Sequence, residues 1–356
     1  MKTLLELIHI ALGYQKEFSH HLTADEWNAL HVQCEIHGLA ELAFVGIQKL
    51  SKEQQPPSDL CIKWSREVQV LNERKERLIK IFKDACETYN RNGFDSCILM
   101  PRFELVRDER LEVREGAPKD IDILCWSKDK KDGKRTIVEY VNFQYVASTH
   151  HIKPKVVRHH VNFESGNIPV EVRFKFSYFN SPLHDRRFLA WVEKKVLSES
   201  PQKGKDGYPI PSDTFNAVYQ LIHLYRKLFC EGLRLGHLYD YYMVLRSLPK
   251  SEHEEVMRVI GRLGMKKFAG AVMYVMQSVF GMPEEYFFCK PIARNGSFVI
   301  SITMQAGEYT RAIERTRMLK HLGRIGHHLY WLKRNRPFLT QYPAEVCFEL
   351  YRRIRG

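Results

Sequence analysis

Two aspartates alternate with two isoleucines in the stretch Asp120-Ile121-Asp122-Ile123. Aspartate is disfavoured in β-strands, and a strand sends successive side chains to opposite faces. The pattern therefore predicts a strand with one apolar face and one acidic face. The two carboxylates would stand about 6–7 Å apart along the strand, and they would repel one another unless a cation or solvent lies between them. A Mg²⁺ site, which suits carboxylates together with substrate phosphates, and a solvated strand end both stay open.

A second apolar stretch carries Glu171 between two valines. The segments Lys155–Phe163 and Ile168–Phe176 flank the turn at 164–167, which predicts a β-hairpin. Next to the first strand, this hairpin would add a third carboxylate. Three carboxylates can hold two metal ions that clamp the attacking and the leaving oxygen of a phosphoryl transfer. The alternative is a solvent-facing residue of an amphipathic hairpin, but the combined spacing favours a metal site with the ligands Asp120, Asp122 and Glu171.

Helical patterns flank this β-rich centre. Thr23 and Glu26 form a capping-box pattern, and a longer helix should run from Asp59 until Gly93 ends it. We expect an N-terminal helical region at 1–92, a small α+β core at 93–199 and a C-terminal helical region with a basic tail at 212–356. The stretch 136–146 permits either strand or helix, and 200–211 should be an exposed loop. The predicted fold class is α+β, with a small mixed sheet between two helical regions.

Composition excludes several classes of protein. Hydrophobic residues make up 44% of the chain and charged residues 27%, which argues against disorder. The 8 cysteines include no C-x-x-C pair, so free thiols in a reducing compartment are expected. Residues 1–14 are typical of an amphipathic helix and not of a signal peptide. The longest uncharged stretch, Phe268–Pro283, is shorter than the roughly 20 residues of a membrane span. We expect a cytoplasmic protein with no membrane partner.

Positive charge is concentrated late in the chain. The formal net charge is +13, which suggests an anionic partner. Between Arg311 and Arg336 the cations are interleaved with aromatic residues such as Tyr330 and Trp331, an arrangement that suits RNA. The same segment also fits a solvated helix whose apolar stripe packs on the body, and the two interpretations are compatible. The doublets His150-His151 and His159-His160 would project to opposite faces of a strand, which disfavours a dedicated metal site.

Ordered matches along nearly the whole chain resemble one family. They are LTADEW and HGLAELAFVGI, QQPP with the following Trp64, DIDIL, IPVEVRF, EGLRLGHLYDYY, GMKKFAGAVMYV and YPAEV. The chain resembles the uncharacterised nucleotidyltransferase family of the DNA polymerase β-like superfamily, in the form common among Bacteroides-type bacteria. The resemblance implies that a hydroxyl attacks the α-phosphate of a nucleoside triphosphate and that pyrophosphate leaves.

The resemblance also assigns roles to residues. Asp120 and Asp122 would hold Mg²⁺, while Glu171 would complete the site and help to deprotonate the hydroxyl. The helix that carries His223 packs near the cleft in this family, so His223 either contacts nucleotide or is a core histidine. The nucleotide, ATP in the first instance, would be the substrate.

The phosphate-binding part of the chain diverges from the family. Relatives carry Lys-Gly after the first core strand, where a small residue lets backbone N–H groups approach phosphates, whereas this chain has Met100-Pro101. Lys119 replaces the glycine before the DID motif, and the usual VEVH reads VEVR, with Arg173. Either new cations bind the phosphates instead, or triphosphate binding is impaired; the cations are Lys119, Arg173, Arg102 and Arg114.

The sequence therefore predicts a Mg²⁺-dependent nucleotidyltransferase that acts on an unidentified acceptor hydroxyl or phosphate. Two alternatives stay open. One is a catalytically silent binding or scaffold protein with the same fold, which Met100-Pro101 favours. The other is an RNA-directed enzyme that uses the basic tail. RNA and a small molecule are both candidate acceptors, and the oligomeric state is not predicted.

Overall fold

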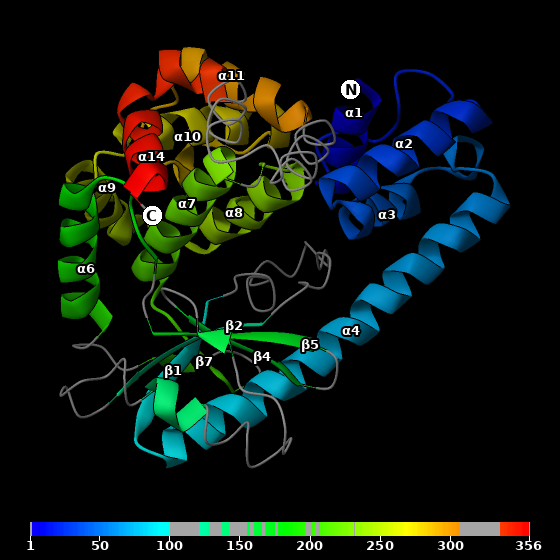
Figure 1. Cartoon of the computed structure of the whole chain (residues 1–356). Coiled ribbons are helices and arrows are strands. Elements are labelled where there is room, and N and C mark those ends of the chain that lie inside the picture. The colour runs from blue at the N-terminus through cyan, green and yellow to red at the C-terminus, as the bar shows by residue number, and fades with distance from the viewer. Residues whose placement is uncertain are drawn as a thin grey trace.

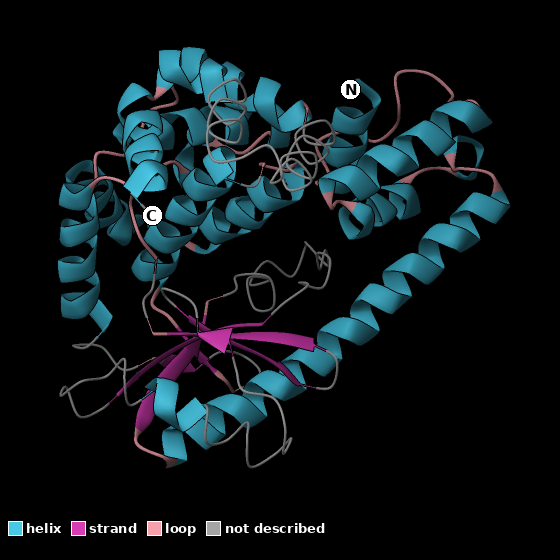
Figure 2. Cartoon of the chain, viewed as in Figure 1, coloured by secondary structure: helices cyan, strands magenta, loops and turns pink. Residues whose placement is uncertain are grey.

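A layer of helices lies above a β-sheet in the computed structural model, and one long helix connects them (Figure 1). The structure describes residues 2–99, 121–127, 137–141, 155–156, 160–165, 168–174, 177–196, 201–203, 207–230, 232–305 and 335–355. Figure 2 shows the same division by secondary structure, with helices above and strands below. The fold is α+β with a mixed sheet, which confirms the predicted class.

The N-terminal helices are α1 (Lys2–Ala11), α2 (Ala24–His37) and α3 (Ala40–Lys49), followed by the short 3-10 helix η1 (Lys52–Gln54). The predicted capping box is present, because the Thr23 hydroxyl accepts from the Glu26 N–H and the Glu26 carboxylate accepts from the Thr23 N–H. Helix α2 ends where Gly38 adopts a φ of 70°, a left-handed conformation that suits glycine.

Helix α4 (Ser58–Arg91) has 34 residues and is therefore about 50 Å long. Its first part packs against the N-terminal helices through the buried Leu60 and Trp64. Its second part covers one face of the sheet with buried apolar side chains, namely Leu78, Phe82, Cys86 and Tyr89. One amphipathic helix thus connects the helical layer to the sheet, as the sequence predicts.

The sheet has the strand order β1-β2-β5-β4-β3. The strands are β1 (Phe94–Ile98), β2 (Ile121–Ser127), β3 (Lys155–Val156), β4 (His160–Ser165) and β5 (Ile168–Arg173). Strands β2 and β5 are parallel, and the other neighbours are antiparallel. The pairing of β4 with β5 confirms the predicted hairpin, and residues 137–141 of the ambiguous stretch are helical.

The two faces of the sheet differ in chemistry. Side chains that face α4 are apolar and buried, among them Ile98, Ile123, Val161, Val170 and Val172. Leu99 and Leu124 face the other way and join the large core of the helical layer. Because side chains alternate along a strand, Asp122 and Glu171 lie on this second face of the sheet.

The C-terminal helices cover that second face. They are α6 (Pro182–Val196), α7 (Asp213–Cys230), α8 (Leu235–Ser247), α9 (His253–Arg262), α10 (Lys266–Phe280), α11 (Ala293–Met304) and α14 (Pro343–Arg355), with short 3-10 helices at Lys250–Glu252 and Glu284–Tyr286. Their buried residues form one core with those of α1, α2 and α3. The two helical regions of the sequence therefore pack as a single layer.

The expectation of an exposed loop at 200–211 is wrong for part of that stretch. Strands β6 (Gln202–Lys203) and β7 (Pro209–Ile210) pair there, and Tyr208 is buried against Phe82 of α4. The aromatic ring of Tyr208 supplies the apolar surface that holds this segment on the body, a signal outweighed in the sequence by its Pro, Gly and Lys.

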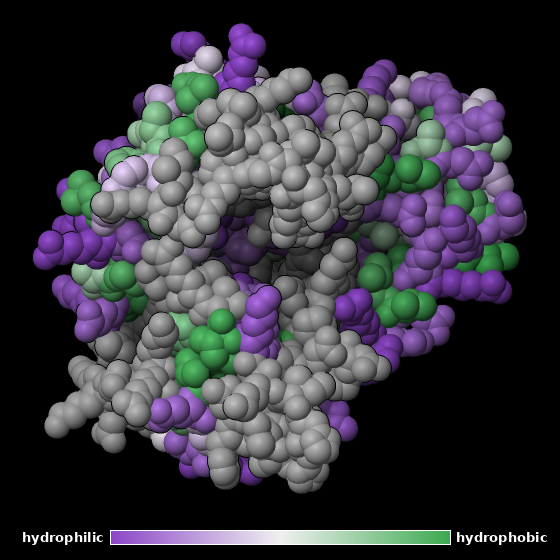
Figure 3. Space-filling view, viewed as in Figure 1, coloured by the Kyte–Doolittle hydropathy of each residue, from purple (hydrophilic) through white to green (hydrophobic). Residues whose placement is uncertain are grey.

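The cysteines whose side chains the structure describes are free, namely Cys34, Cys61, Cys86, Cys97, Cys125, Cys289 and Cys347. Cys34, Cys86, Cys97 and Cys125 are buried, as expected, whereas Cys347 is exposed. Among the described helices, none is long and apolar enough to cross a membrane. Over α2 and the first part of α4 the visible surface is mostly hydrophilic, broken by separate apolar groups (Figure 3).

Candidate active site

Asp122 and Glu171 lie directly opposite one another on neighbouring parallel strands. Asp122 of β2 pairs with Glu171 of β5 in the strand register, and parallel neighbours are about 4.8 Å apart. The residues that follow them, Ile123 and Val172, are buried on the α4 side. The apolar residues thus fix the register, and the register brings the two carboxylates together on the face below α7.

The guanidinium of Arg173 joins both carboxylates. Its Nε donates to Asp122 Oδ1 at 2.8 Å, and its Nη2 donates to Asp122 Oδ2 at 3.2 Å and to Glu171 Oε2 at 2.7 Å. The three side chains retain only 15–19% of their exposure. A two-pronged Arg–carboxylate contact of this kind is among the stronger polar contacts in proteins.

Asp122 and Arg173 hold one another ionised. Burial acts to raise the pKa of Asp122, but the charge and hydrogen bonds of Arg173 outweigh it and the pKa is lowered. A hydrogen-bonding contribution from Glu171 acts in the same direction, so the two carboxyl groups lie close enough to interact. Burial likewise acts to lower the pKa of Arg173, and Asp122 and Glu171 raise it. Asp122 is therefore a carboxylate, and Arg173 a cation, at neutral pH.

His160 of β4 completes this row of polar side chains. It pairs with Arg173 in the strand register, and its Nε2 lies 3.7 Å from Glu171 Oε1. Burial, together with the charge of Arg173, lowers the pKa of His160 to about 4, so the ring is uncharged at neutral pH. The histidine doublet by itself does not predict the place of His160 beside Glu171 and Arg173. Counting back from the turn at 164–167 would have placed it beside Arg173.

Helix α7 faces the carboxylates with Tyr219 and His223. The two rings stack at 6.4 Å, and Phe215 stacks on Tyr219 at 5.9 Å. Burial raises the pKa of Tyr219, and the charges of Arg173 and Asp122 act on it in opposite directions. His223 contributes to the lowered pKa of Asp122. Both side chains therefore lie close to the carboxylate pair.

Four of the predicted site residues are thus neighbours: Asp122, Glu171, Arg173 and His223. The remaining ones, Asp120, Lys119 and Arg114, lie outside the described residues, as do Met100-Pro101, Arg102 and nearly all of the basic tail, 306–334. The last described residue before Met100 is Leu99. Its N–H donates to the Asp122 carbonyl, and its own carbonyl accepts from Gln220 of α7.

The carboxylate pair offers the oxygen ligands that Mg²⁺ prefers. One nitrogen, Nη2 of Arg173, is within 3.2 Å of Asp122 Oδ2 and within 2.7 Å of Glu171 Oε2. Oxygens of both carboxylates therefore contact the same positively charged nitrogen. The donor chemistry and the placement fit a divalent cation bound by Asp122 and Glu171.

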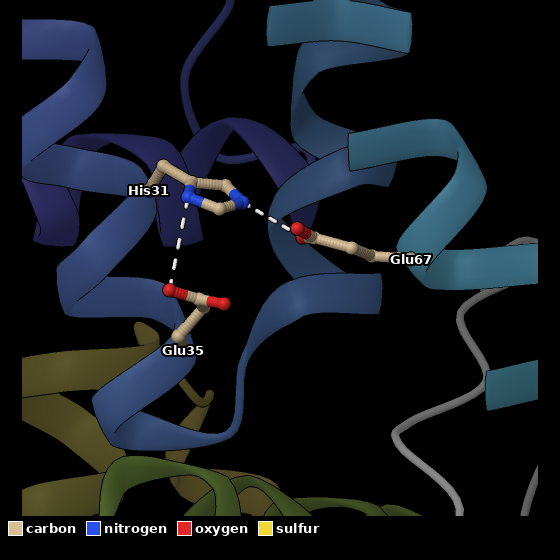
Figure 4. Close-up of side chains that lie close together, drawn as sticks. All are labelled: His31, Glu35 and Glu67. Carbon is tan, nitrogen blue, oxygen red and sulfur yellow. Dashed lines mark hydrogen bonds and ion pairs between the residues drawn. The ribbon is translucent and has the colours of Figure 1, made fainter. Parts of the chain in front are cut away.

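A second group of metal-ligating residue types lies in the N-terminal helices: His31 and Glu35 of α2 and Glu67 of α4. His31 Nε2 is 2.7 Å from Glu67 Oε2, and its Nδ1 is 3.8 Å from Glu35 Oε2. Figure 4 shows the carboxylates at opposite nitrogens of the ring. One ligand atom from each of the three residues lies within 4.8 Å of the other two, but the two carboxylates contact different nitrogens of the ring. In this arrangement the buried imidazole, packed edge-on against Trp64, ties α2 to α4.

The chain is similar to known proteins over much of its length. A family model described as an uncharacterised nucleotidyltransferase matches residues 23–281, which is more than half of the chain. Among solved structures, an antigenic nucleotidyltransferase-like protein from Paracoccidioides brasiliensis matches with 11% identity and a TM-score of 0.32, over 58% of this chain and 98% of that one. None of the curated proteins matches.

Proposed function

The chain belongs to the uncharacterised nucleotidyltransferase family, and we propose that it transfers a nucleoside monophosphate from a nucleoside triphosphate to an acceptor hydroxyl or phosphate, with Mg²⁺ as cofactor. ATP is the first candidate for the donor. The single observation that carries this proposal is the pairing of Asp122 with Glu171 across two parallel strands on the face below α7. A chain that needed only a stable sheet would have no reason to bury two carboxylates there.

The residues take distinct roles in the proposed reaction. Asp122 and Glu171, together with the sequence-predicted Asp120, would hold Mg²⁺, which when bound neutralises the triphosphate and polarises its α-phosphorus. Arg173 would bind phosphate oxygens through its two-pronged guanidinium. His223 would contact the nucleotide from α7, and Lys119 and Arg114 are proposed as further phosphate ligands.

The chemical step can be written with its atoms balanced. The acceptor oxygen forms a bond to the α-phosphorus, the bond from that phosphorus to the bridging oxygen breaks, and pyrophosphate leaves. The proton of an acceptor hydroxyl passes to a carboxylate. Glu171 is the proposed acceptor of this proton, the role that the family resemblance implies for it. A carboxylate held next to the acceptor is a suitable general base.

Two observations favour a second candidate function. Arg173 already neutralises part of the charge on Asp122 and Glu171, and Met100-Pro101 replaces the residues that cradle phosphates in relatives. A catalytically silent protein that binds nucleotide or serves as a scaffold would combine these two features. An RNA-directed transferase differs from the leading proposal only in its acceptor, which the basic segment 311–336 would hold.

A label-transfer assay separates these functions. The protein is incubated with each of four α-³²P nucleoside triphosphates and Mg²⁺, with tRNA, a protein extract or a metabolite extract as acceptor. We expect label to move to one acceptor class, and Asp122→Asn to reduce the rate by about a thousandfold. The matched control is Glu87→Gln, an exposed carboxylate of α4 that pairs only with Arg91 among the described residues. Nucleotide binding without any transfer would support the silent protein instead.

A further inference from the structure

Arg173 stands where a divalent cation would have to stand. The position between Asp122 Oδ2 and Glu171 Oε2 is taken by Nη2 of the guanidinium. The fork also contacts Asp122 Oδ1, so three of the four carboxylate oxygens face this one side chain. The chain therefore supplies its own counter-cation to the pair.

A guanidinium and a metal ion cannot share this position. Two positive groups within a few ångström of one another in a partly buried site repel strongly. If both carboxylates are ionised, the pair with Arg173 carries a charge of −1. A divalent ion that displaced the guanidinium would neutralise the carboxylates and leave Arg173 as an uncompensated, largely buried cation, which is costly. Binding of the metal alone therefore replaces the guanidinium as the partner of the carboxylates and leaves Arg173 without a counter-ion.

A triphosphate changes that balance. Guanidinium forks bind phosphate oxygens in the same two-pronged manner as carboxylates. Arg173 is the last residue of β5, and its side chain keeps 15% of its exposure. The guanidinium therefore lies at the carboxyl end of β5 and is partly accessible, so it can exchange its carboxylate partners for phosphate oxygens.

We infer that Arg173 is an internal competitor of the divalent cation, so that metal and nucleoside triphosphate bind to the site only together. The guanidinium pairs with Asp122 and Glu171 in the free protein and with the phosphates in the loaded one. This inference rests on the proposed function, since it assumes that the carboxylate pair is a metal site. The inference adds a regulatory property to that function. The free protein does not bind the metal, and binding of the nucleotide makes metal binding possible.

Direct measurement of Mn²⁺ binding by electron paramagnetic resonance tests the inference without relying on catalysis. In the wild-type protein, we expect Mn²⁺ to bind at least about tenfold more tightly with a non-hydrolysable triphosphate than alone, a typical coupling between linked sites. In Arg173→Gln, Mn²⁺ alone should bind at least about tenfold more tightly than it does to the wild type. The matched control is Arg226→Gln. Arg226 lies on α7 over the Tyr178 ring, close enough to act on Tyr219, but is not among the hydrogen-bond donors to the carboxylates. It should change Mn²⁺ affinity less than about twofold.

The outcomes separate the inference from the proposed function. If Mn²⁺ alone binds the wild type as tightly as it binds Arg173→Gln, the competition is refuted while the metal site stands. If Mn²⁺ binds neither protein, with or without triphosphate, the metal site fails and both ideas fall. Should Arg173→Gln not fold, the coupling in the wild type and the affinity of Arg173→Lys decide. That variant keeps the charge but loses the fork, so its affinity for Mn²⁺ alone should exceed that of the wild type.

Discussion

Two places in this chain set one nitrogen-bearing side chain between two carboxylates, and they differ in where the carboxylates meet it. On the sheet, Asp122 and Glu171 converge on a single nitrogen of Arg173. In the helical layer, Glu35 and Glu67 approach opposite nitrogens of His31 (Figure 4). The convergent carboxylates share one point of contact that a metal ion can take over, whereas Glu35 and Glu67 each engage a different nitrogen of His31, although one ligand atom of each residue lies within 4.8 Å of the others. Residue types alone therefore do not identify a metal site.

The largest expected effect comes from the convergent pair. Asp122→Asn removes a partly buried carboxylate from Arg173, and loss of one partner of such a pair costs about 3 kcal/mol. Urea unfolding with and without Mn²⁺ plus a triphosphate measures the cost and any ligand stabilisation. We expect ligand stabilisation in the wild type and none in the variant. Equal stability of Asp122→Asn and the wild type would show that the ion pair contributes little.

The divergent pair should respond to mutation and not to metal. His31→Gln removes a buried ring that joins α2 to α4 and leaves Glu67 without its 2.7 Å partner, at an expected cost of about 2 kcal/mol. Added Mn²⁺ or Zn²⁺ should not stabilise the wild type through this group. The control is His21→Gln, which is exposed. Metal stabilisation of the wild type that His31→Gln abolished would break the comparison.

A second buried histidine of α2 provides a pH test of the helical layer. Burial, with a contribution from the charge of Arg234, lowers the pKa of His37 to about 4. The unfolded chain therefore takes up a proton near pH 6.5 while the folded chain does not, and stability falls as the pH drops from about 6.5 towards 4. Between pH 8 and pH 6 the loss should be about 0.5–1 kcal/mol. His37→Gln should reduce the stability loss between the two pH values by that amount, as measured in urea titrations, and leave the part due to other buried histidines such as His160. An unchanged loss would assign all of it to those other groups.

The smallest effects should separate the two carboxylates of the helical layer. Glu67 lies 2.7 Å from His31 and Glu35 3.8 Å, and Glu35 is 53% exposed. Glu67→Gln should cost about 1 kcal/mol, and Glu35→Gln less than about 0.5 kcal/mol. Thermal unfolding of the two variants side by side checks the order. A larger loss for Glu35→Gln would mean that the contacts of the imidazole differ from those described.

Local signals account for most of what the sequence could predict. The capping box at Thr23, the long helix from Asp59 and the hairpin around 164–167 each depend on a few neighbouring residues. Alternation of apolar and acidic residues also places Asp122 and Glu171 on faces that the β2–β5 register brings together. The remaining features depend on distant packing. His31 and Glu67 are 36 positions apart and meet only because α2 lies against α4.

The role of Arg173 shows where strand parity stops being informative. Parity places Arg173 on the same face as Glu171, but it does not say whether the guanidinium points to solvent, to a phosphate or to the carboxylates. The structure selects the carboxylates, since the guanidinium donates to both oxygens of Asp122 and to Glu171 Oε2. The alternation of side chains along β5 could not predict that the Arg173 guanidinium contacts these two carboxylates.

Anomalous X-ray scattering at the manganese edge, from crystals grown with Mn²⁺ and a non-hydrolysable triphosphate, tests the central claim most directly. The account predicts a manganese peak between Asp122 and Glu171, with the Arg173 guanidinium moved onto the phosphates. It also predicts no manganese at His31. A peak bounded by His31, Glu35 and Glu67, or a bound triphosphate with Arg173 still on both carboxylates and no manganese beside them, would contradict it.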